Sequence, residues 1–302
     1  MNTGTTSHPH RTLITLLIGC TIFLLAVTTS YSLTPPSDTL EGTPIYFPII
    51  VAGPSDASNC NPTGGSRGLA PGRYRTTVAG LNATVVVGQG YDPRTPTYLA
   101  FFLHGDNGSW TKFLSTSNPV TKFVNQQGWI FVAPQSPNDG ESWWTHWSGD
   151  HNQAFSRVLD EMFAKYNVCR DMVFGSSGSG GSEFWTSHFF PAKGAEYPAH
   201  TVIGCGGNDG YSRTSRQQVI ALGRDPNVVR KSTFEYVYGT EDYLYNLVRE
   251  SITLYTNAGF NVHVHELAGA GHCNEWPADG FPDLSTQIAT YWAKRAAALG
   301  AD

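Results

Sequence analysis

Short apolar runs alternate with segments of helical periodicity along most of the chain. The clearest helix is predicted over 153–166, where Phe155, Val158, Leu159 and Met162 recur at the spacing of one helical face. β-Branched and apolar runs predict strands at Arg73–Val78, Ala83–Val87, Tyr98–Leu103, Trp129–Ala133, Met172–Gly175, Thr201–Gly204, Phe234–Tyr238 and Asn261–Leu267. Further helices are predicted at 111–126, Gly181–Phe190, 214–223, 243–258 and Leu284–Leu299.

This alternation of strand and helix predicts an α/β fold. The first two strands flank a turn at 80–82 and form a hairpin, whereas the later strands need crossover connections. We therefore expect a mainly parallel central sheet flanked by helices on both faces. In such sheets ligands bind beyond the carboxyl ends of the strands, so the residues directly after each strand are the candidates for chemistry.

A serine-rich turn follows the strand at Met172–Gly175. A nucleophile at a sharp strand-to-helix turn needs small residues two positions before and two positions after it. Ser179 meets this condition with Ser177 and Gly181, and Ser177 meets it with Gly175 and Ser179. We favour Ser179 because two glycines then open the following helix, and Ser177 is the alternative.

Two later turns carry an acid and a base. Asp242 follows the strand Phe234–Tyr238, with Glu241 as the alternative acid, although Asp242 could instead cap the next helix. His272 lies in a glycine- and alanine-rich loop after the strand Asn261–Leu267. Serine, acid and histidine in this order along the chain are typical of one large fold of hydrolases. We predict that Ser179, Asp242 and His272 form a catalytic triad.

The loop after the strand Tyr98–Leu103 is the candidate oxyanion hole. It reads His104-Gly105-Asp106, and its main-chain N–H groups would lie beside the amide that follows the nucleophile. We assign the N–H groups of Asp106 and Gly180 to this role.

At this point the sequence resembles a family, the secreted polyhydroxybutyrate depolymerase and feruloyl esterase-like α/β-hydrolases. The resemblance rests on motifs at 68–74, 90–93, 103–105, 179–181, 239–242 and 271–273 and covers about residues 60–300. It implies the α/β-hydrolase fold without a large lid, and the triad named above. It also implies activity on esters of hydroxyacids, aryl acids or acetylated sugars. Ser177 replaces the glycine of the family two residues before the nucleophile, Asp106 follows His-Gly, and 143–147 is unusually aromatic, which leaves the substrate open.

The N-terminus predicts export. A short region with Arg11 precedes an apolar run from Leu13 to Val27, and small polar residues follow it. We expect residues 1–32 to be a signal peptide or, if uncleaved, a membrane anchor. Residues 33–59 are expected to be a linker, and residues 60–302 the catalytic domain. The location would be secreted or extracytoplasmic.

Four cysteines remain when Cys20, inside this apolar run, is set aside. An even number in an exported chain suggests two disulfides, with three pairings open, or else four buried thiols. Because Cys205 and Cys273 each follow a strand that ends at the same edge of the sheet, we favour Cys205–Cys273. Cys60–Cys169 is the second pair that we favour, on weaker grounds.

Composition excludes several classes of partner. The formal net charge is −5 and no basic stripe appears, so we expect no nucleic-acid partner. No cofactor motif is visible. His263 and His265 could form a metal pair, but no third ligand is apparent, so we expect neither cofactor nor metal.

Trp110, Trp147 and Trp276 could line a substrate platform or simply pack under loops, whereas packing is favoured for Trp143.

Together these patterns predict an exported serine esterase that forms an acyl-enzyme on a small or polymeric ester. Two alternatives are a serine peptidase of the same fold and a non-catalytic binding module. Cleavage of amides would favour the first alternative. A folded protein that no serine-directed phosphonate labels would favour the second.

Overall fold

The structure is a computed structural model that describes residues 60–144, 149–208, 212–273 and 283–299. All of them belong to one compact unit, Ile45–Asp302. The predicted signal or anchor at 1–32, the linker at 33–59 and Cys20 lie outside the described residues. Among the helices of the described ranges, none has the length and apolarity needed to cross a membrane.

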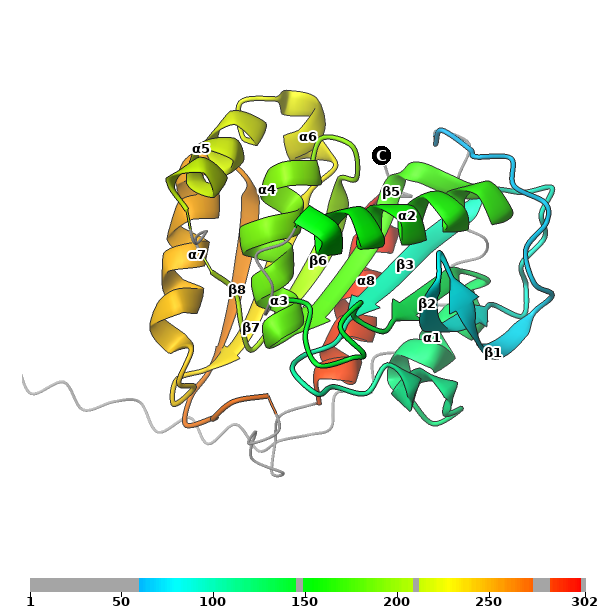
Figure 1. The fold of residues 1–302 in the computed structure, drawn as a ribbon, viewed down its shortest axis with the longest axis horizontal. Helices are drawn as coiled ribbons and strands as arrows, with labels where there is room; N and C mark the ends of the chain where they lie inside the picture. Colours follow the sequence, from blue (N-terminus) through cyan, green and yellow to red (C-terminus); the bar gives the residue numbers. More distant parts are fainter. Residues whose placement is uncertain (1–59, 145–148, 209–211, 274–282, 300–302) are drawn as a thin grey trace, which may run out of the picture. The chain divides into compact units, whose positions relative to one another are not determined.

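An eight-stranded sheet forms the centre, in the order β1-β2-β4-β3-β5-β6-β7-β8 (Figure 1). The strands are β1 (Gly72–Val78), β2 (Leu81–Val87), β3 (Thr97–Leu103), β4 (Ile130–Pro134), β5 (Val168–Gly178), β6 (Ala199–Gly204), β7 (Thr233–Gly239) and β8 (Asn261–Leu267). Strand β2 runs antiparallel to β1 and β4, and all other neighbours are parallel. The predicted hairpin and the mainly parallel sheet are both confirmed.

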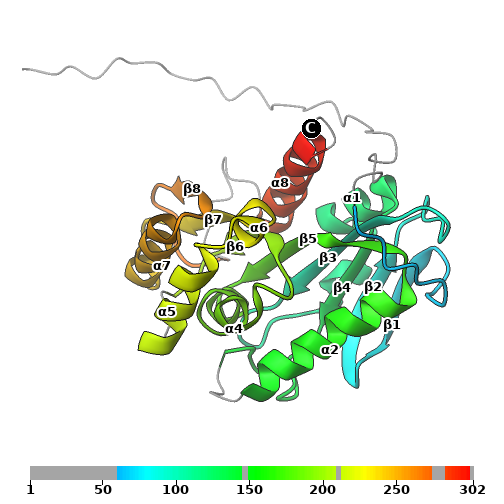
Figure 2. The same cartoon turned by 90° about the horizontal axis from the view of Figure 1, so that it is seen from above.

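Helices cover both faces of this sheet, as predicted (Figure 2). One face packs against η2 (Thr111–Leu114), α1 (Pro119–Gln127) and α8 (Leu284–Leu299). The other packs against α2 (Gly149–Lys165), α3 (Gly180–Phe184), η3 (Trp185–Phe189), α4 (Phe190–Lys193), α5 (Arg213–Leu222), α6 (Pro226–Arg230) and α7 (Tyr245–Ala258). Within the described residues, the strand connections consist only of these helices and of loops.

Strand β3 shows why the central strands are continuously apolar. Successive side chains point to opposite faces, so Phe101 and Leu103 join the cluster under α2, whereas Tyr98 and Phe102 join the cluster under α1 and α8. Each fully buried side chain of this size contributes about 1.5–3 kcal/mol. Both faces therefore stabilise the strand, at whose end the His104 loop begins.

The helix predicted over 111–126 is interrupted, which corrects that expectation. Asn118 adopts an extended conformation before Pro119, because proline disfavours the helical conformation in the residue that precedes it. The Asn118 side chain then caps α1 by accepting hydrogen bonds from the N–H groups of Val120 (2.9 Å) and Thr121 (3.3 Å). The chain between η2 and α1 is left as a loop.

Strand β5 is longer than predicted and reaches Gly178. Its serines are tolerated in the core because each hydroxyl has a partner. Ser176 donates to the carbonyl of Phe101 at 2.9 Å, and the Ser177 hydroxyl lies 3.0 Å from that of Ser182. The predicted helix Gly181–Phe190 forms as α3, the π-helical turn η3 and α4 in succession.

Two disulfides link segments that are distant in sequence, with the pairing expected. Cys60 bonds Cys169 on β5, and Cys205 after β6 bonds Cys273 in the loop after β8, each with Cα atoms 5.3 Å apart.

Protonation of His200 should link the stability of this fold to pH. Burial lowers the pKa of His200 to about 3, with Arg295 adding to the effect, whereas an unfolded histidine titrates near 6.5. The unfolded chain therefore binds this proton first, and stability is lost as the pH falls from about 6.5 towards 3. Between pH 7 and pH 4 the loss from this group is about 3 kcal/mol. Urea unfolding at both pH values should show a smaller loss for His200→Gln than for wild type; equal losses would contradict the assignment.

Candidate active site

Ser179 lies on a sharp turn between β5 and α3. Its backbone has φ 49° and ψ −122°, a strained conformation for a residue with a side chain. The Ser179 N–H donates to the carbonyl of Gly204 at 2.9 Å, which ties the turn to the end of β6. The side chain is half-buried and lines a cleft at the carboxyl edge of the sheet.

The glycine two residues after Ser179 is required by a close approach. A Cβ at Gly181 would overlap the carbonyl oxygens of Leu103 and His104 at the end of β3. At Gly178, on the other side of the serine, a Cβ would make only ordinary contacts, the nearest being Leu284 at 3.4 Å. The turn is therefore tight on its helical side and roomy on its strand side.

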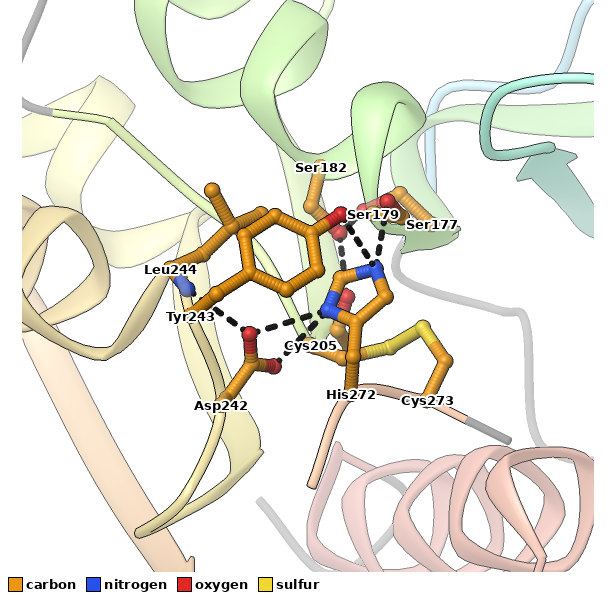
Figure 3. The surroundings of a disulfide bond; sticks show 10 residues. Ser177, Ser179, Ser182, Cys205, Asp242, Tyr243, Leu244, His272 and Cys273 are labelled. Atoms are coloured by element: carbon orange, nitrogen blue, oxygen red, sulfur yellow. Dashed lines mark hydrogen bonds and ion pairs between the residues drawn. A yellow bond between two sulfur atoms is a disulfide. The ribbon is translucent and has the colours of Figure 1, made fainter. Parts of the chain in front are cut away.

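His272 and Asp242 complete a row of hydrogen bonds with Ser179 (Figure 3). His272 Nε2 lies 2.8 Å from Ser179 Oγ, and His272 Nδ1 lies 2.9 and 3.0 Å from the two carboxylate oxygens of Asp242. Because an ionised carboxylate can only accept, Nδ1 donates and Nε2 is left to accept the serine proton. The Asp242 side chain is fully buried, and the N–H of Leu244 also donates to it at 2.8 Å.

The alternatives raised by the sequence occupy other positions. Ser177 lies within β5, and its hydroxyl bonds that of Ser182, which itself donates to the carbonyl of Gly204 at 2.9 Å. Glu241 is exposed. The residue at the N-cap of α7 is Leu244, so the Asp242 carboxylate is not the helix cap.

Main-chain hydrogen bonds hold the acid turn against the loop of the base. The N–H of Thr240 donates to the carbonyl of Leu267 at 3.0 Å, and the N–H of Glu241 donates to that of Ala270 at 2.9 Å. The Thr240 hydroxyl accepts from the N–H of Gly269 at 2.8 Å. The disulfide from Cys205 then anchors the residue directly after His272.

The loop after β3 is held in place by a buried histidine. His104 Nε2 accepts from the N–H of Ser136 at 3.0 Å, so its Nδ1 carries the proton and donates to the carbonyl of Gly105 at 2.7 Å. Burial lowers the pKa of His104 and favours this neutral form. The Asp106 carboxylate accepts from the hydroxyl of Ser142 (2.5 Å) and from Trp144 Nε1 (2.9 Å).

Two main-chain donors next to Ser179 are available for a ligand. Gly180 is the first residue of α3, so its N–H has no partner inside the helix. In the described part of the chain, neither this N–H nor that of Asp106 makes a hydrogen bond. Both residues lie close together, because a Cβ on Gly180 would overlap the carboxylate of Asp106.

The cleft has a volume of about 800 Å³ and includes a residue that sequence reasoning missed. Tyr243 lies over the imidazole of His272, with ring centroids 4.5 Å apart and its hydroxyl 3.3 Å from Nε2 (Figure 3). Its position directly after Asp242 was the only signal in the sequence. Most other lining residues come from the β3 loop, from the segment between η2 and α1, and from the start of α8.

The tryptophans proposed to bind substrate have different outcomes. Trp110 is buried in the cluster under α1, with the guanidinium of Arg75 5.2 Å from its ring, and it is not among the lining residues of the cleft. We therefore replace the substrate role with packing. Trp143 is fully buried, as favoured. Trp147 and Trp276 lie outside the described residues.

The histidine pair on β8 lies elsewhere. His265 bonds the carboxylate of Glu235, and neither it nor His263 lines the cleft. Among the described residues, no group of three or more histidine, cysteine, aspartate or glutamate side chains could hold a metal ion.

Comparison with known proteins identifies the fold. No protein-family model and no curated protein matches this sequence. A mutant of the feruloyl esterase module from Clostridium thermocellum, complexed with sinapinate, is similar in structure, with a TM-score of 0.55 and 14% identity over 78% of this chain and 91% of that one. A propionate-bound esterase from Thermogutta terrifontis gives a TM-score of 0.51 and 15% identity over 76% and 95%. With this strand order, the chain has the α/β-hydrolase fold.

Gly178 and Gly181, on either side of Ser179, should differ in their tolerance of alanine. Gly181→Ala forces a methyl group against two main-chain oxygens that cannot move freely, so we expect a loss of about 1–3 kcal/mol or more in unfolding free energy. Gly178→Ala is the matched control and should change stability by less than about 1 kcal/mol. Thermal and urea unfolding of both variants test this, and equal effects would contradict the close approach at Gly181.

Proposed function

We propose that this chain is an exported serine esterase that hydrolyses carboxylic esters through an acyl-enzyme intermediate. The observation that carries the proposal is the hydrogen-bonded row of Ser179, His272 and Asp242. The serine lies on a strained turn beside two N–H groups that have no partner among the described residues. A nucleophile, an oriented base and oxyanion donors are the parts that acyl transfer needs.

In the proposed reaction, Ser179 Oγ attacks the ester carbonyl while His272 Nε2 takes its proton. Asp242 holds the Nδ1–H tautomer and stabilises the imidazolium that forms. The carbon–oxygen bond to the alcohol then breaks, and the alcohol oxygen takes the proton from Nε2. Water attacks the resulting acyl-enzyme by the same steps, which releases the acid and restores Ser179.

The N–H groups of Asp106 and Gly180 would stabilise the oxyanion of each tetrahedral intermediate. One such donor is typically worth about 3 kcal/mol of transition-state stabilisation. Because they belong to the main chain, these donors are positioned by the fold rather than by flexible side chains. In this role the side chain of Asp106 orients its loop through Ser142 and Trp144.

The substrate class follows from the resemblance and from the structural neighbours. The resemblance suggests an ester of a hydroxyacid, an aryl acid or an acetylated sugar, in small or polymeric form. Two neighbours are named as a feruloyl esterase module and an esterase, which supports an ester and, within this set, an aryl acid. The two disulfides and the apolar N-terminal run support export, with membrane anchoring if that run is retained.

Replacing the two candidate serines should separate their roles. Ser179→Ala should lower kcat by at least about 10³-fold on p-nitrophenyl butyrate, because the nucleophile is gone. Ser177→Ala, two residues away in β5, should keep nearly full activity. A fluorophosphonate should label wild type and the Ser177 variant but not the Ser179 variant. Full activity of Ser179→Ala, or no labelling of folded wild type, would refute the proposal.

The disulfide next to His272 should matter for activity more than the distant one. Removing Cys205–Cys273 with a double alanine variant frees the His272 loop, and a displacement near 1 Å can cost up to about a hundredfold in rate. Removing Cys60–Cys169 in the same way should lower stability by up to about 5 kcal/mol without changing kcat/KM. Both are measured at a temperature at which the variants are folded; equal losses of kcat/KM would contradict this distinction.

A further inference from the structure

The hydroxyl of Tyr243 lies beside the nitrogen that must give its proton to the departing alcohol. It lies 3.3 Å from His272 Nε2, on the same side as the Ser179 hydroxyl, which lies 2.8 Å from that nitrogen. During ester cleavage the alcohol oxygen is bonded to the carbon that Ser179 attacks, and it must come within hydrogen-bond reach of Nε2 to receive the proton. An alcohol oxygen in that position would therefore lie next to the Tyr243 hydroxyl.

The neutral imidazole cannot satisfy both hydroxyls equally. With Nδ1 donating to Asp242, His272 Nε2 has a single lone pair in the plane of the ring, and the shorter contact gives it to Ser179. The Tyr243 hydroxyl keeps the longer contact with Nε2 and lies within hydrogen-bond reach of the Ser179 side chain, so it can donate to an oxygen bonded at that position when substrate is bound. Partial burial raises the pKa of the Tyr243 phenol, and the charge of Asp242 adds to this, so the phenol keeps its proton and can donate.

The setting of Tyr243 suits contact with a substrate rather than packing. Its side chain is 75% exposed and lines the cleft with Ser179 and His272, whereas the other tyrosines near this strand end are at least partly buried. The backbone of Tyr243 is nevertheless fixed by hydrogen bonds to the residue before it. The carboxylate of Asp242 accepts from the N–H of Leu244, and the main-chain carbonyl of Asp242 accepts from the N–H of Tyr245. The ring is thus carried on a rigid turn.

We propose, on the basis of the esterase function proposed above, that Tyr243 positions the leaving-group oxygen and thereby favours esters of poorly leaving alcohols. When the tetrahedral intermediate collapses, the electron pair of the carbon–oxygen bond moves onto the alcohol oxygen. The Tyr243 hydroxyl donates a hydrogen bond to that alcohol oxygen and keeps its own proton. The alcohol oxygen receives its proton from Nε2 of the imidazolium. The alcohol leaves neutral, and His272 returns to its neutral form.

Leaving groups of different basicity test this role. An ethoxide must be protonated as it departs, whereas p-nitrophenolate is a stable anion that leaves without protonation. Tyr243→Phe keeps the ring over His272 and removes only the hydroxyl. We expect kcat/KM for ethyl butyrate to fall about five- to tenfold, the loss of one hydrogen bond, and kcat/KM for p-nitrophenyl butyrate to change less than twofold. Since kcat/KM reports acylation, the shared butyryl-enzyme does not enter the comparison.

Tyr245→Phe is the matched control. Tyr245 is two residues away, and its hydroxyl accepts from Arg249 at 3.0 Å instead of facing the cleft, so both rate constants should stay unchanged. An equal fall on both esters in Tyr243→Phe, no change on either, or a rise would overturn the role of Tyr243. Wild type that hydrolyses neither ester would overturn the esterase proposal itself, and with it this inference.

Discussion

The close approach between the turn after β5 and the end of β3 is the constraint on which the candidate site depends. Gly181 lies against the carbonyls of Leu103 and His104, where a side chain would overlap them. The missing side chain permits a tight turn, within which Ser179 has a positive φ. The same geometry starts α3 at Gly180 and leaves its N–H without a helical partner. One steric contact thus sets both the direction of the hydroxyl and one proposed oxyanion donor.

The other two members of the row are held mainly by the backbone. The turn that carries Asp242 and the loop that carries His272 are joined by hydrogen bonds from Thr240 and Glu241 to carbonyls of the loop. The disulfide from Cys205 adds a covalent link to a loop that is rich in glycine and alanine and has few side chains to pack. Because such a loop is costly to order, several independent restraints are needed to keep the imidazole within 3 Å of both partners.

Residues around the loop after β3 position the proposed oxyanion hole without taking part in the proposed reaction. Neutral His104 bridges Ser136 and the carbonyl of Gly105, and the Asp106 carboxylate is held by Ser142 and Trp144. These contacts hold the proposed oxyanion loop in place. Tyr243 is different, since it is exposed and its hydroxyl lies beside both the base and the Ser179 side chain. It is the part of the site through which the nature of the alcohol can influence the rate.

The sequence by itself determined the sheet, its parallel character and the edge at which the chemistry gathers, because period and apolarity follow from which faces each element buries. It also placed Ser179, Asp242 and His272 after three different strands that end at this edge. It did not determine the break at Asn118–Pro119, where a loop and a helix cap interrupt the predicted helix. It also did not determine the length of β5, because the polar serines at the end of this strand do not indicate burial until their hydrogen-bond partners are known. Only the tertiary structure separated Ser179 from Ser177, buried Trp110 and placed Tyr243 over His272. Those outcomes depend on which side chains, far apart in the chain, pack against one another, and the local pattern does not specify that packing.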